Sequence, residues 1–387
     1  MNLAIMADIA GWATLVVWLY LAVGRGRFWL ATERDDGTEG APAVWPRVAI
    51  VVPARDEAGT IAQSVESLLR QDYAGDWELI LVDDNSSDGT AEIARQTAAR
   101  LGVASRLRLV RGCPLAPGWT GKLWAVKQGV AAALGSSEPP RYLLLTDADI
   151  VHAPDALTRL VARAEAGGLV LTSLMAKLRC ESFAERSHVP AFIFFFQMLY
   201  PFSWVNRPGR RTAAGAGGCM LVRADALAQA GGIDAVRSAL IDDCALARAL
   251  KARGPIWLGL TDRVRSVRPY PTLREIGSMI SRSAYAQLNY SPLALAGTAA
   301  GMALTYVAPP LLAVFADGSA RVLGIVSWLL MAALFQPTLR FYRLSPVWGL
   351  ALPAIGLSYL IFTLESALQF TRGRGGMWKG RVQAAGP

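Results

Sequence analysis

Histidine and paired cysteine are nearly absent from this 387-residue sequence. It has two histidines, His152 and His188, and four cysteines, none of which forms a CxxC pair. The shortage of histidine excludes a histidine-rich metal site and favours a carboxylate as any general base. Cysteines spaced in this way argue against a zinc site and fit a reducing compartment. Internal repeats are also lacking, which excludes a repeat array.

Charge is scarce in four long stretches. Hydrophobic residues make up 53% of the chain and the mean hydropathy is positive, so the apolar share exceeds that of an ordinary soluble protein. The stretches, with at most one charged residue each, have the length of membrane segments and cover 3–23, 291–316, 322–339 and 347–364. Residues 45–185 read as soluble sequence. We therefore expect one soluble domain between hydrophobic ends.

Basic residues gather beside these apolar stretches. The first stretch has no basic region before it and is followed by Arg25 and Arg27, so residues 1–30 are predicted to be an uncleaved anchor, with the soluble domain on the cytoplasmic side of an inner membrane. The polar residues 31–46 are predicted to be a linker. The net charge is +9, and anionic lipid headgroups explain its distribution better than nucleic acid does. The residues concerned are Arg207, Arg210, Arg211, Arg340, Arg343, Arg372, Arg374, Lys379 and Arg381.

The soluble part alternates short β-like runs with helical patterns. The runs cover 47–54, 77–84, 107–112 and 142–149, and the helices cover about 58–71, a segment from Asp88 and a segment from about Gly121. This order is typical of βαβ units, so we predict an α/β fold with a mostly parallel sheet. Ligands of such sheets bind at the carboxyl ends of the strands. Acidic and polar residues follow three of the four runs there.

The sequence "DAD" at 147–149 is the sharpest of these acidic clusters. Asp147 and Asp149 are two residues apart, so in an extended chain both face the same side and can hold one hard cation. A cation held by so few carboxylates completes its shell with water and phosphates, which favours a divalent ion carrying a diphosphate. The alternative is a turn with solvated carboxylates. The cluster "DDNSSDGT" (83–90) also has a structural alternative, because Ser87 and Asp88 suit caps of the helix that follows it.

Taken together, the motifs resemble inverting family 2 glycosyltransferases with the GT-A fold. The resemblance rests on "VVPARDEAGTIAQSVESLLRQDY", "ELILVDDNSSDGTAEIA" and "TDADI", and covers roughly residues 47–255. The further order of "GWTGKLWAVKQG", "AAGAGGCMLVRADAL" and "IDDCALARAL" between membrane ends is most similar to hopene-associated glycosyltransferases. We therefore expect a GT-A domain over 47–285, followed by C-terminal membrane helices and a basic tail over 286–387.

The resemblance implies a role for individual residues. Asp243, with its neighbour Asp242, matches the catalytic pair in which the second acid is the general base, and Asp149 matches the residue that binds Mg²⁺ or Mn²⁺. Residues implied on the nucleotide-sugar side are Pro53, Asp56, Glu57, Asp84, Lys122 and Asp147, and those on the acceptor side are Gly217, Gly218 and Arg282.

Each assignment has a plainer alternative. Asp242 and Asp243 also suit a charged helix N-terminus, which is compatible with catalysis because it would keep Asp243 ionised. Lys122 also suits a solvated helix start, and the glycines suit a tight turn before a strand. The family's Gln/Arg-x-x-Arg-Trp motif is reduced to Arg282 in "MISRSAYAQL", where Ser283 replaces tryptophan. This departure argues against a polymer-building enzyme.

Two apolar segments pose a question of topology. Residues 189–206 are hydrophobic enough to span, but one crossing there would separate Asp149 from Asp243. The segment is therefore predicted to lie in the membrane interface, with a buried helix of the soluble core as the alternative. If 3–23 enters the cytoplasm and 291–316 and 322–339 form a hairpin, the chain is again cytoplasmic before residue 347. A further crossing would then export the basic tail, 371–381, so residues 347–364 are predicted to be re-entrant or interfacial.

The prediction for function follows from these expectations. The chain is expected to transfer a sugar from a nucleotide diphosphate sugar, most often UDP-linked in this family, to a lipid acceptor such as a hopanoid or another polyisoprenoid. The alternatives are a non-catalytic nucleotide-sugar-binding membrane scaffold and a polysaccharide synthase-like enzyme. The expected partners are the donor, the acceptor and the membrane, with no nucleic acid.

Overall fold

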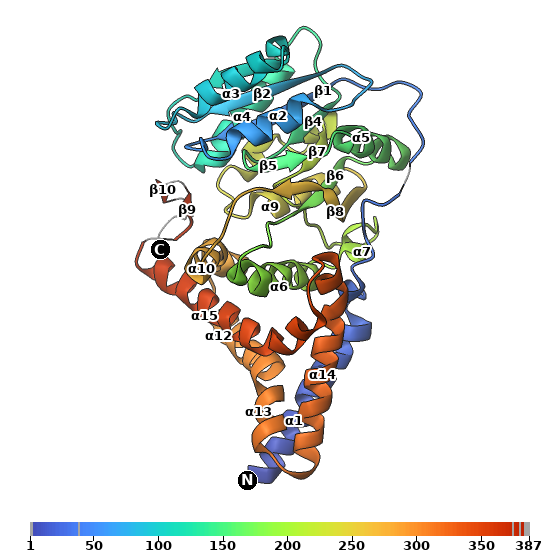
Figure 1. Ribbon diagram of the computed structural model, residues 1–387, viewed down its shortest axis with the longest axis vertical. Helices are drawn as coiled ribbons and strands as arrows, with labels where there is room; N and C mark the ends of the chain where they lie inside the picture. The colour runs from blue at the N-terminus through green and yellow to red at the C-terminus, as the bar shows by residue number, and fades with distance from the viewer. Residues whose placement is uncertain (1–2, 38, 374, 379–380, 383–387) are drawn as a thin grey trace.

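The structure is a computed structural model that describes residues 3–37, 39–373, 375–378 and 381–382. A sheet domain lies at one end and an apolar helical stem at the other, with several helices crossing between them (Figure 1). The N-terminal helix lies in the stem, and the last described strands lie beside the domain (Figure 1).

Eight strands form one mixed sheet in the order β3-β2-β1-β4-β7-β6-β8-β5. The strands are β1 Val48–Ala54, β2 Trp77–Asp83, β3 Leu107–Arg111, β4 Tyr142–Leu145, β5 Ile150–His152, β6 Leu171–Lys177, β7 Met220–Arg223 and β8 Ile256–Ser266. The first four strands are parallel, as predicted, whereas β7 is antiparallel to both β4 and β6. A two-stranded pair, β9 Met377–Trp378 and β10 Arg381–Val382, stands apart.

The helices predicted at about 58–71, from Asp88 and from about Gly121 are present, and further helices follow along the domain. They are α2 Ile61–Leu69, α3 Thr90–Arg100, α4 Gly121–Leu134, α5 Ala156–Gly167, α6 Phe183–Leu199, α7 Phe202–Val205, α8 Ala224–Gln229, α9 Asp242–Lys251, α10 Leu273–Ser281 and α11 Ala284–Gln287. Alternate residues of β1 face opposite sides of the sheet. Ile50 packs with α2, α3 and α5, whereas Val51 packs with α4. A Cβ at Gly129 in α4 would lie 2.4 Å from Val51, so only glycine allows this close contact.

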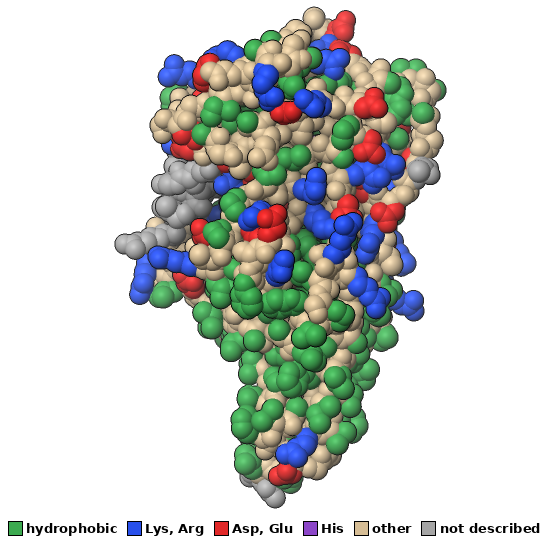
Figure 2. Space-filling model, viewed as in Figure 1, with side chains coloured by type: hydrophobic (Ala, Val, Ile, Leu, Met, Phe, Trp, Pro, Cys, Tyr) green, Lys and Arg blue, Asp and Glu red, His purple; other side chains and the backbone are tan. Residues whose placement is uncertain are grey.

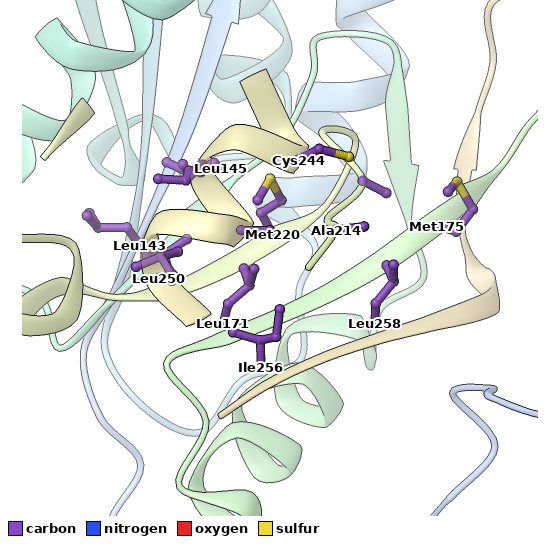
Figure 3. Close-up of a cluster of buried hydrophobic side chains, with 14 of the residues drawn as sticks. Leu143, Leu145, Leu171, Met175, Ala214, Met220, Cys244, Leu250, Ile256 and Leu258 are labelled. Carbon is purple, nitrogen blue, oxygen red and sulfur yellow. The ribbon is translucent and has the colours of Figure 1, made fainter. Parts of the chain in front are cut away.

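Helix α9 is held firmly by the core on one face of the sheet. Cys244 and Leu250 of α9 lie among side chains of β4, β6, β7 and β8 (Figure 3). Both are at most 2% exposed, and burial of such side chains stabilises the packing by about 1.5–3 kcal/mol each. The first turn of α9, which carries Asp242 and Asp243, is therefore fixed relative to the ends of the strands.

The stem contains the apolar helices predicted at both ends of the chain. They are α1 Leu3–Leu19 with its continuation Tyr20–Gly24, α12 Pro292–Met302, α13 Ala308–Phe315, α14 Gly318–Phe341 and α15 Leu352–Thr371. Four helical segments are long and apolar enough to cross a membrane: Leu3–Gly24, Pro292–Phe315, Gly318–Phe341 and Pro346–Thr371. Hydrophobic side chains predominate on the visible face of the stem, whereas most charged side chains lie on the domain and at its junction with the stem (Figure 2). This distribution is the one expected of a membrane-embedded part.

Helix α6 lies between the domain and the stem. It contacts α10, α14 and α15, and its Phe194 is fully buried. The helix begins with a capping box formed by Ser182 and Glu185 and contains Pro190 in its interior, so it starts earlier than the predicted segment. The helix is therefore packed between the sheet domain and the apolar stem.

The predicted linker also differs from a free loop. Arg34 forms an isolated parallel bridge with Leu260 of β8, and Asp35 is 3% exposed. The guanidinium of Arg263 lies 3.6 Å from the Asp35 carboxylate. Polar composition predicted a linker, but hydrogen bonding to the backbone of β8 orders part of it along the sheet.

Candidate active site

A small cavity lies where the carboxyl ends of β1 and β4 meet the first turns of α4 and α9. Its volume is about 20 Å³, close to the space for one water molecule. Six residues predicted for the site line it: Pro53, Lys122, Asp147, Gly217, Asp242 and Asp243. Residues separated widely in sequence therefore meet at the edge where α/β sheets bind their ligands.

Lys122 is the cation at the centre of this cavity. Thr120 caps α4 by accepting a hydrogen bond from the Leu123 amide, and Lys122 projects from the same first turn. Its Nζ lies 2.9 Å from Oδ1 of Asp147 and 3.2 Å from Oδ2 of Asp242. Burial lowers the pKa of Lys122, but Asp147 and Asp242 outweigh it and raise that pKa above its usual value. The lysine is thus charged at neutral pH and ties the two acids together.

Asp243 sits next to this ion pair. Its Oδ2 accepts a hydrogen bond of 3.0 Å from the Gly217 amide, and its Oδ1 accepts one of 2.7 Å from the Cys244 amide. Burial and the neighbouring Asp242 raise the pKa of Asp243 to about 6, while Lys122 and the two amides oppose the rise. The helix N-terminus therefore does not hold the pKa low, because loss of hydration outweighs it. The carboxylate is still ionised above pH 6, in the range that suits a general base.

A second charged cluster lies beside the first. Arg268, just after β8, donates from Nε to Oδ2 of Asp149 at 2.7 Å and from its NH2 group to both carboxylate oxygens of Glu57 at 2.7 and 2.8 Å. Burial lowers the pKa of Arg268, and the two carboxylates more than restore it. Glu57 was predicted from the end of β1 and Asp149 from the end of β4, so one arginine joins two predicted residues.

The "DAD" segment differs from the extended geometry assumed for it. Strand β4 ends at Leu145, and residues 148–149 form a turn. As a result Asp147 pairs with Lys122, whereas Asp149 pairs with Arg268. The two carboxylates remain close enough for Asp149 to raise the pKa of Asp147, in addition to the larger effect of burial.

The residues present have the chemistry of a site for a hard cation, although they are not gathered around one. Within the described residues, no group of three His, Cys, Asp or Glu side chains is arranged to hold a metal ion. Carboxylate oxygens are nevertheless the ligands that Mg²⁺ and Mn²⁺ prefer, and Mg²⁺ is commonly held by one or two carboxylates with substrate phosphates. Asp149 and Asp147 fit such a shared site.

The remaining residues predicted to bind the nucleotide sugar lie in or beside two loops that hydrogen bonds connect. The Asp84 side chain is 2% exposed and lies 3.6 Å from Arg55. Asp56 has a left-handed backbone (φ 50°), and its Oδ1 accepts a hydrogen bond from the Ser87 amide. Asp88 accepts from the amides of Ala58 and of Thr90, the first residue of α3, so it joins the two loops. The N-cap position of α3 is held by Gly89, not by Ser87 or Asp88.

Two residues predicted on the acceptor side lie outside the cavity lining. Gly218 is packed in the core, where a Cβ would lie 3.2 Å from Ile150. Arg282 is exposed at the end of α10. Burial raises the pKa of Tyr270, and Arg282 is one of the two arginines whose charge opposes the rise. Gly217 alone of the three lines the cavity.

Two residues of the site went unrecognised in the sequence. Arg268 follows the carboxyl end of β8, and a cation at such a strand end was the available signal. Tyr200 ends α6 and exchanges hydrogen bonds with Gln287. Burial raises the pKa of Tyr200 to about 12, with smaller effects from Cys244 and Asp243. No local signal marked Tyr200, because its proximity to Asp243 arises from the tertiary fold.

Comparisons with known proteins agree with this architecture. Residues 49–231 match the profile of Glycosyl transferase family 2. EpsE of Bacillus subtilis (strain 168), named as a glycosyltransferase, is 42% identical over 66 residues, which are 17% of this chain and 23% of that protein. An N-acetylglucosaminyltransferase of Mesorhizobium japonicum is 29% identical over 154 residues, which are 39% of this chain and 33% of that protein. The matches thus span 23% and 33% of the length of these relatives.

A solved structure extends the likeness to the apolar helices of the stem. A mannosyltransferase from Pyrobaculum calidifontis, solved with GDP-Man and Mn²⁺, has a TM-score of 0.56 and 19% identity, covering 94% of this chain and 98% of that one. At this identity the likeness concerns the fold. Together these comparisons support one conclusion: the sheet domain has the GT-A fold, and residues 49–231 within it match the profile of Glycosyl transferase family 2.

Proposed function

We propose that the protein transfers a sugar, with inversion, from a nucleotide diphosphate sugar to a hydroxyl group of a membrane-embedded lipid. The observation that carries the proposal is the meeting of Lys122, Asp147 and Asp243 in one cavity. It combines a cation for a diphosphate with a carboxylate base for an acceptor hydroxyl, which are the two requirements of a single displacement. The chain's own residues need form no covalent intermediate.

The proton transfer follows from the hydrogen bonds of Asp243. The amides of Gly217 and Cys244 occupy one direction of each oxygen, and a carboxylate oxygen has a further lone pair. An acceptor hydroxyl that donates to this lone pair gives up its proton as its oxygen attacks the anomeric carbon. The leaving diphosphate develops charge, which Lys122 neutralises from the start of α4. A Mg²⁺ or Mn²⁺ ion held by Asp149 and Asp147 would add Lewis-acid stabilisation of the same diphosphate.

The donor must widen the cavity in order to bind. A space of about 20 Å³ does not hold a hexose, and Lys122 spans the gap between Asp147 and Asp242. Diphosphate oxygens can take over the hydrogen bonds of Lys122, since phosphate is a strong acceptor for ammonium groups. Binding of the donor would thereby release Asp242 and open the path toward Asp243.

The lipid nature of the acceptor is supported by the position of α6. At the end of α6, the charge of Asp243 adds to the larger effect of burial in raising the pKa of Tyr200. The body of α6 contacts α14 and α15 of the apolar stem. A lipid hydroxyl at the membrane surface could approach Asp243 along this helix. The hopanoid or polyisoprenoid identity rests on the likeness of the motifs to hopene-associated glycosyltransferases, and the cytoplasmic side of an inner membrane rests on Arg25 and Arg27.

The test is transfer by the purified full chain. Labelled UDP-sugars and GDP-mannose would be supplied with lipid extracts from cells that lack the gene, and the products would be read by mass spectrometry. We expect a glycosylated lipid that is also missing from those cells. Binding of a nucleotide sugar without transfer or hydrolysis would instead favour the non-catalytic scaffold.

A further inference from the structure

A second cavity lies away from the proposed catalytic cavity, at the junction of stem and domain. Its volume is about 500 Å³, and it is lined by the end of the first candidate membrane span and by the region of α7. It shares no lining residue with the catalytic cavity. Arg27, Arg207 and Arg210 converge there beside Trp204. We call this group the arginine pocket.

The arginine pocket is built by a strained turn. Gly26 and Arg27 both have positive φ, at 65° and 50°, and a Cβ on Gly26 would lie 2.7 Å from Nε1 of Trp204. Ser203 donates a hydrogen bond of 2.7 Å to the Gly26 carbonyl, which ties the turn to α7. Such close packing keeps the mouth of the pocket at a fixed position relative to the end of the span.

The pocket carries uncompensated positive charge. Among the described residues, Arg27, Arg207 and Arg210 have no carboxylate within ion-pair distance, whereas many arginines of the sheet domain do, Arg47, Arg263 and Arg268 among them. Arg210 lies over the Trp204 ring at 5.1 Å, and Arg25 lies over it at the same distance. Arg25 also donates hydrogen bonds to the carbonyls of Met198 and Leu199. The other three guanidiniums are therefore the ones available to an anion.

The position of the pocket at the end of the first candidate span indicates which anion it would bind. It adjoins Gly24, where the first candidate span ends, and basic side chains gather there between the apolar stem and the charged domain (Figure 2). Arginine forks match phosphate oxygens, and tryptophan is enriched at the headgroup level of bilayers. A nucleic acid would need a groove open to the solvent, away from the stem.

We infer that the arginine pocket binds the phosphate of an anionic phospholipid headgroup and anchors the domain at a fixed height above the membrane. This inference rests on the proposal that the stem lies in a membrane. It does not require transferase activity, so its test measures lipid binding alone. A soluble phosphate ester carries the same phosphate group as the lipid, so competition between the two distinguishes these ligands.

The experiment is native mass spectrometry of the full chain with added dioleoyl phosphatidylglycerol or phosphatidylcholine. We expect the wild type to retain phosphatidylglycerol preferentially. The triple variant Arg27→Gln, Arg207→Gln, Arg210→Gln should lower that affinity by at least about tenfold, since a juxtamembrane arginine contributes roughly fivefold. The matched control, Arg274→Gln, Arg340→Gln, Arg343→Gln, loses the same charge from exposed positions beside stem and domain that do not line the pocket, so it should lower the affinity clearly less than the pocket variant does.

A second pair of variants leaves all the arginines in place. Thr32 lines the pocket and is exposed, so Thr32→Glu adds a repelling carboxylate, while Thr32→Gln adds the same bulk without charge. Only the glutamate variant should lose phosphatidylglycerol. Displacement of the lipid by glycerol 3-phosphate or by polyuridylate would overturn the lipid assignment. Equal retention by the two triple variants would overturn the pocket itself.

Discussion

The amide of Gly217 donates a hydrogen bond of 3.0 Å to Oδ2 of Asp243. A Cβ at position 217 would lie 3.1 Å from Nζ of Lys122, so glycine allows the backbone to approach both the proposed base and the proposed diphosphate-binding cation. This contact fixes the orientation of Asp243 and leaves its second lone pair for a substrate.

The metal prediction concerns Asp149. If Asp149 supplies a carboxylate to Mg²⁺ or Mn²⁺, EDTA should abolish transfer and either ion should restore it. Asp149→Ala should lose about 3 kcal/mol of transition-state stabilisation, roughly 10²-fold in rate, without rescue by added metal. Steady-state assays across a metal titration measure this. Full activity of Asp149→Ala in EDTA would sink the assignment.

Arg268 should compete with a cation for Asp149. Because its guanidinium pairs with both Asp149 and Glu57, Arg268→Gln should leave two close carboxylates uncompensated and lower the free energy of unfolding by about 1–2 kcal/mol. The same variant should bind Mn²⁺ more tightly in the absence of donor, measured by electron paramagnetic resonance. Arg265→Gln, on β8 itself, is the control. Unchanged Mn²⁺ affinity would show that the arginine does not occupy the cation's place.

The pH dependence has two opposite signs at Asp243. Transfer needs the ionised carboxylate, so kcat should fall as the pH drops through about 6. Stability behaves oppositely, because the folded state, with a pKa of about 6, binds the proton more tightly than the unfolded chain does, with its ordinary value of 3.8. The wild type thus loses stability as pH rises between these values. Asp243→Asn lacks that loss, so its Tm relative to the wild type should increase from about pH 4 to pH 7. A constant difference would contradict the raised pKa.

The topology prediction concerns the C-terminus. Figure 1 places α1 in the stem, whereas β9 and β10 lie near the domain, beyond the end of α15. Helix α15 contacts α6 and α10 as well as the stem helices, which supports an interfacial or re-entrant segment. A reporter fused after Pro387 should therefore be active on the same side as the sheet domain. Activity only on the opposite side would require Pro346–Thr371 to cross fully.

Local sequence patterns were sufficient for the first half of the sheet. The strands β1 to β3 and the helices between them agree with the predicted runs within a few residues, because alternating and helical periodicities reflect burial on the two faces of a sheet. The antiparallel strand β7 gave no comparable signal, since its pairing with β4 joins segments far apart in the chain. The α/β class was therefore predictable, while the mixed strand directions were not.

The site was predictable in its membership more than in its contacts. The "DAD" spacing identified Asp147 and Asp149, but the end of β4 at Leu145 turns the chain and gives each acid a different cation. Arg268 lies 119 residues beyond Asp149, so no local pattern relates them. Helix α6 shows a similar limit, because apolar composition alone does not distinguish burial in protein from burial in lipid. Within the basic tail, Arg374, Lys379 and Gly380 lie outside the described residues.

The most direct test of the proposed mechanism is the turnover of Asp243→Asn compared with its affinity for the nucleotide sugar. The substitution keeps the shape of the side chain and one acceptor for the Gly217 amide but removes the proton acceptor. The activation barrier should therefore rise by about 3–5 kcal/mol, which lowers kcat on the order of 10²–10⁴-fold, while Kd for the donor stays nearly unchanged. Asp242→Asn is the matched control, because it removes the carboxylate that competes with the diphosphate for Lys122 but leaves the Asp243 carboxylate in place. It should not weaken donor binding and should slow turnover much less than Asp243→Asn does. Near-normal turnover of Asp243→Asn would contradict the role of Asp243 as the base.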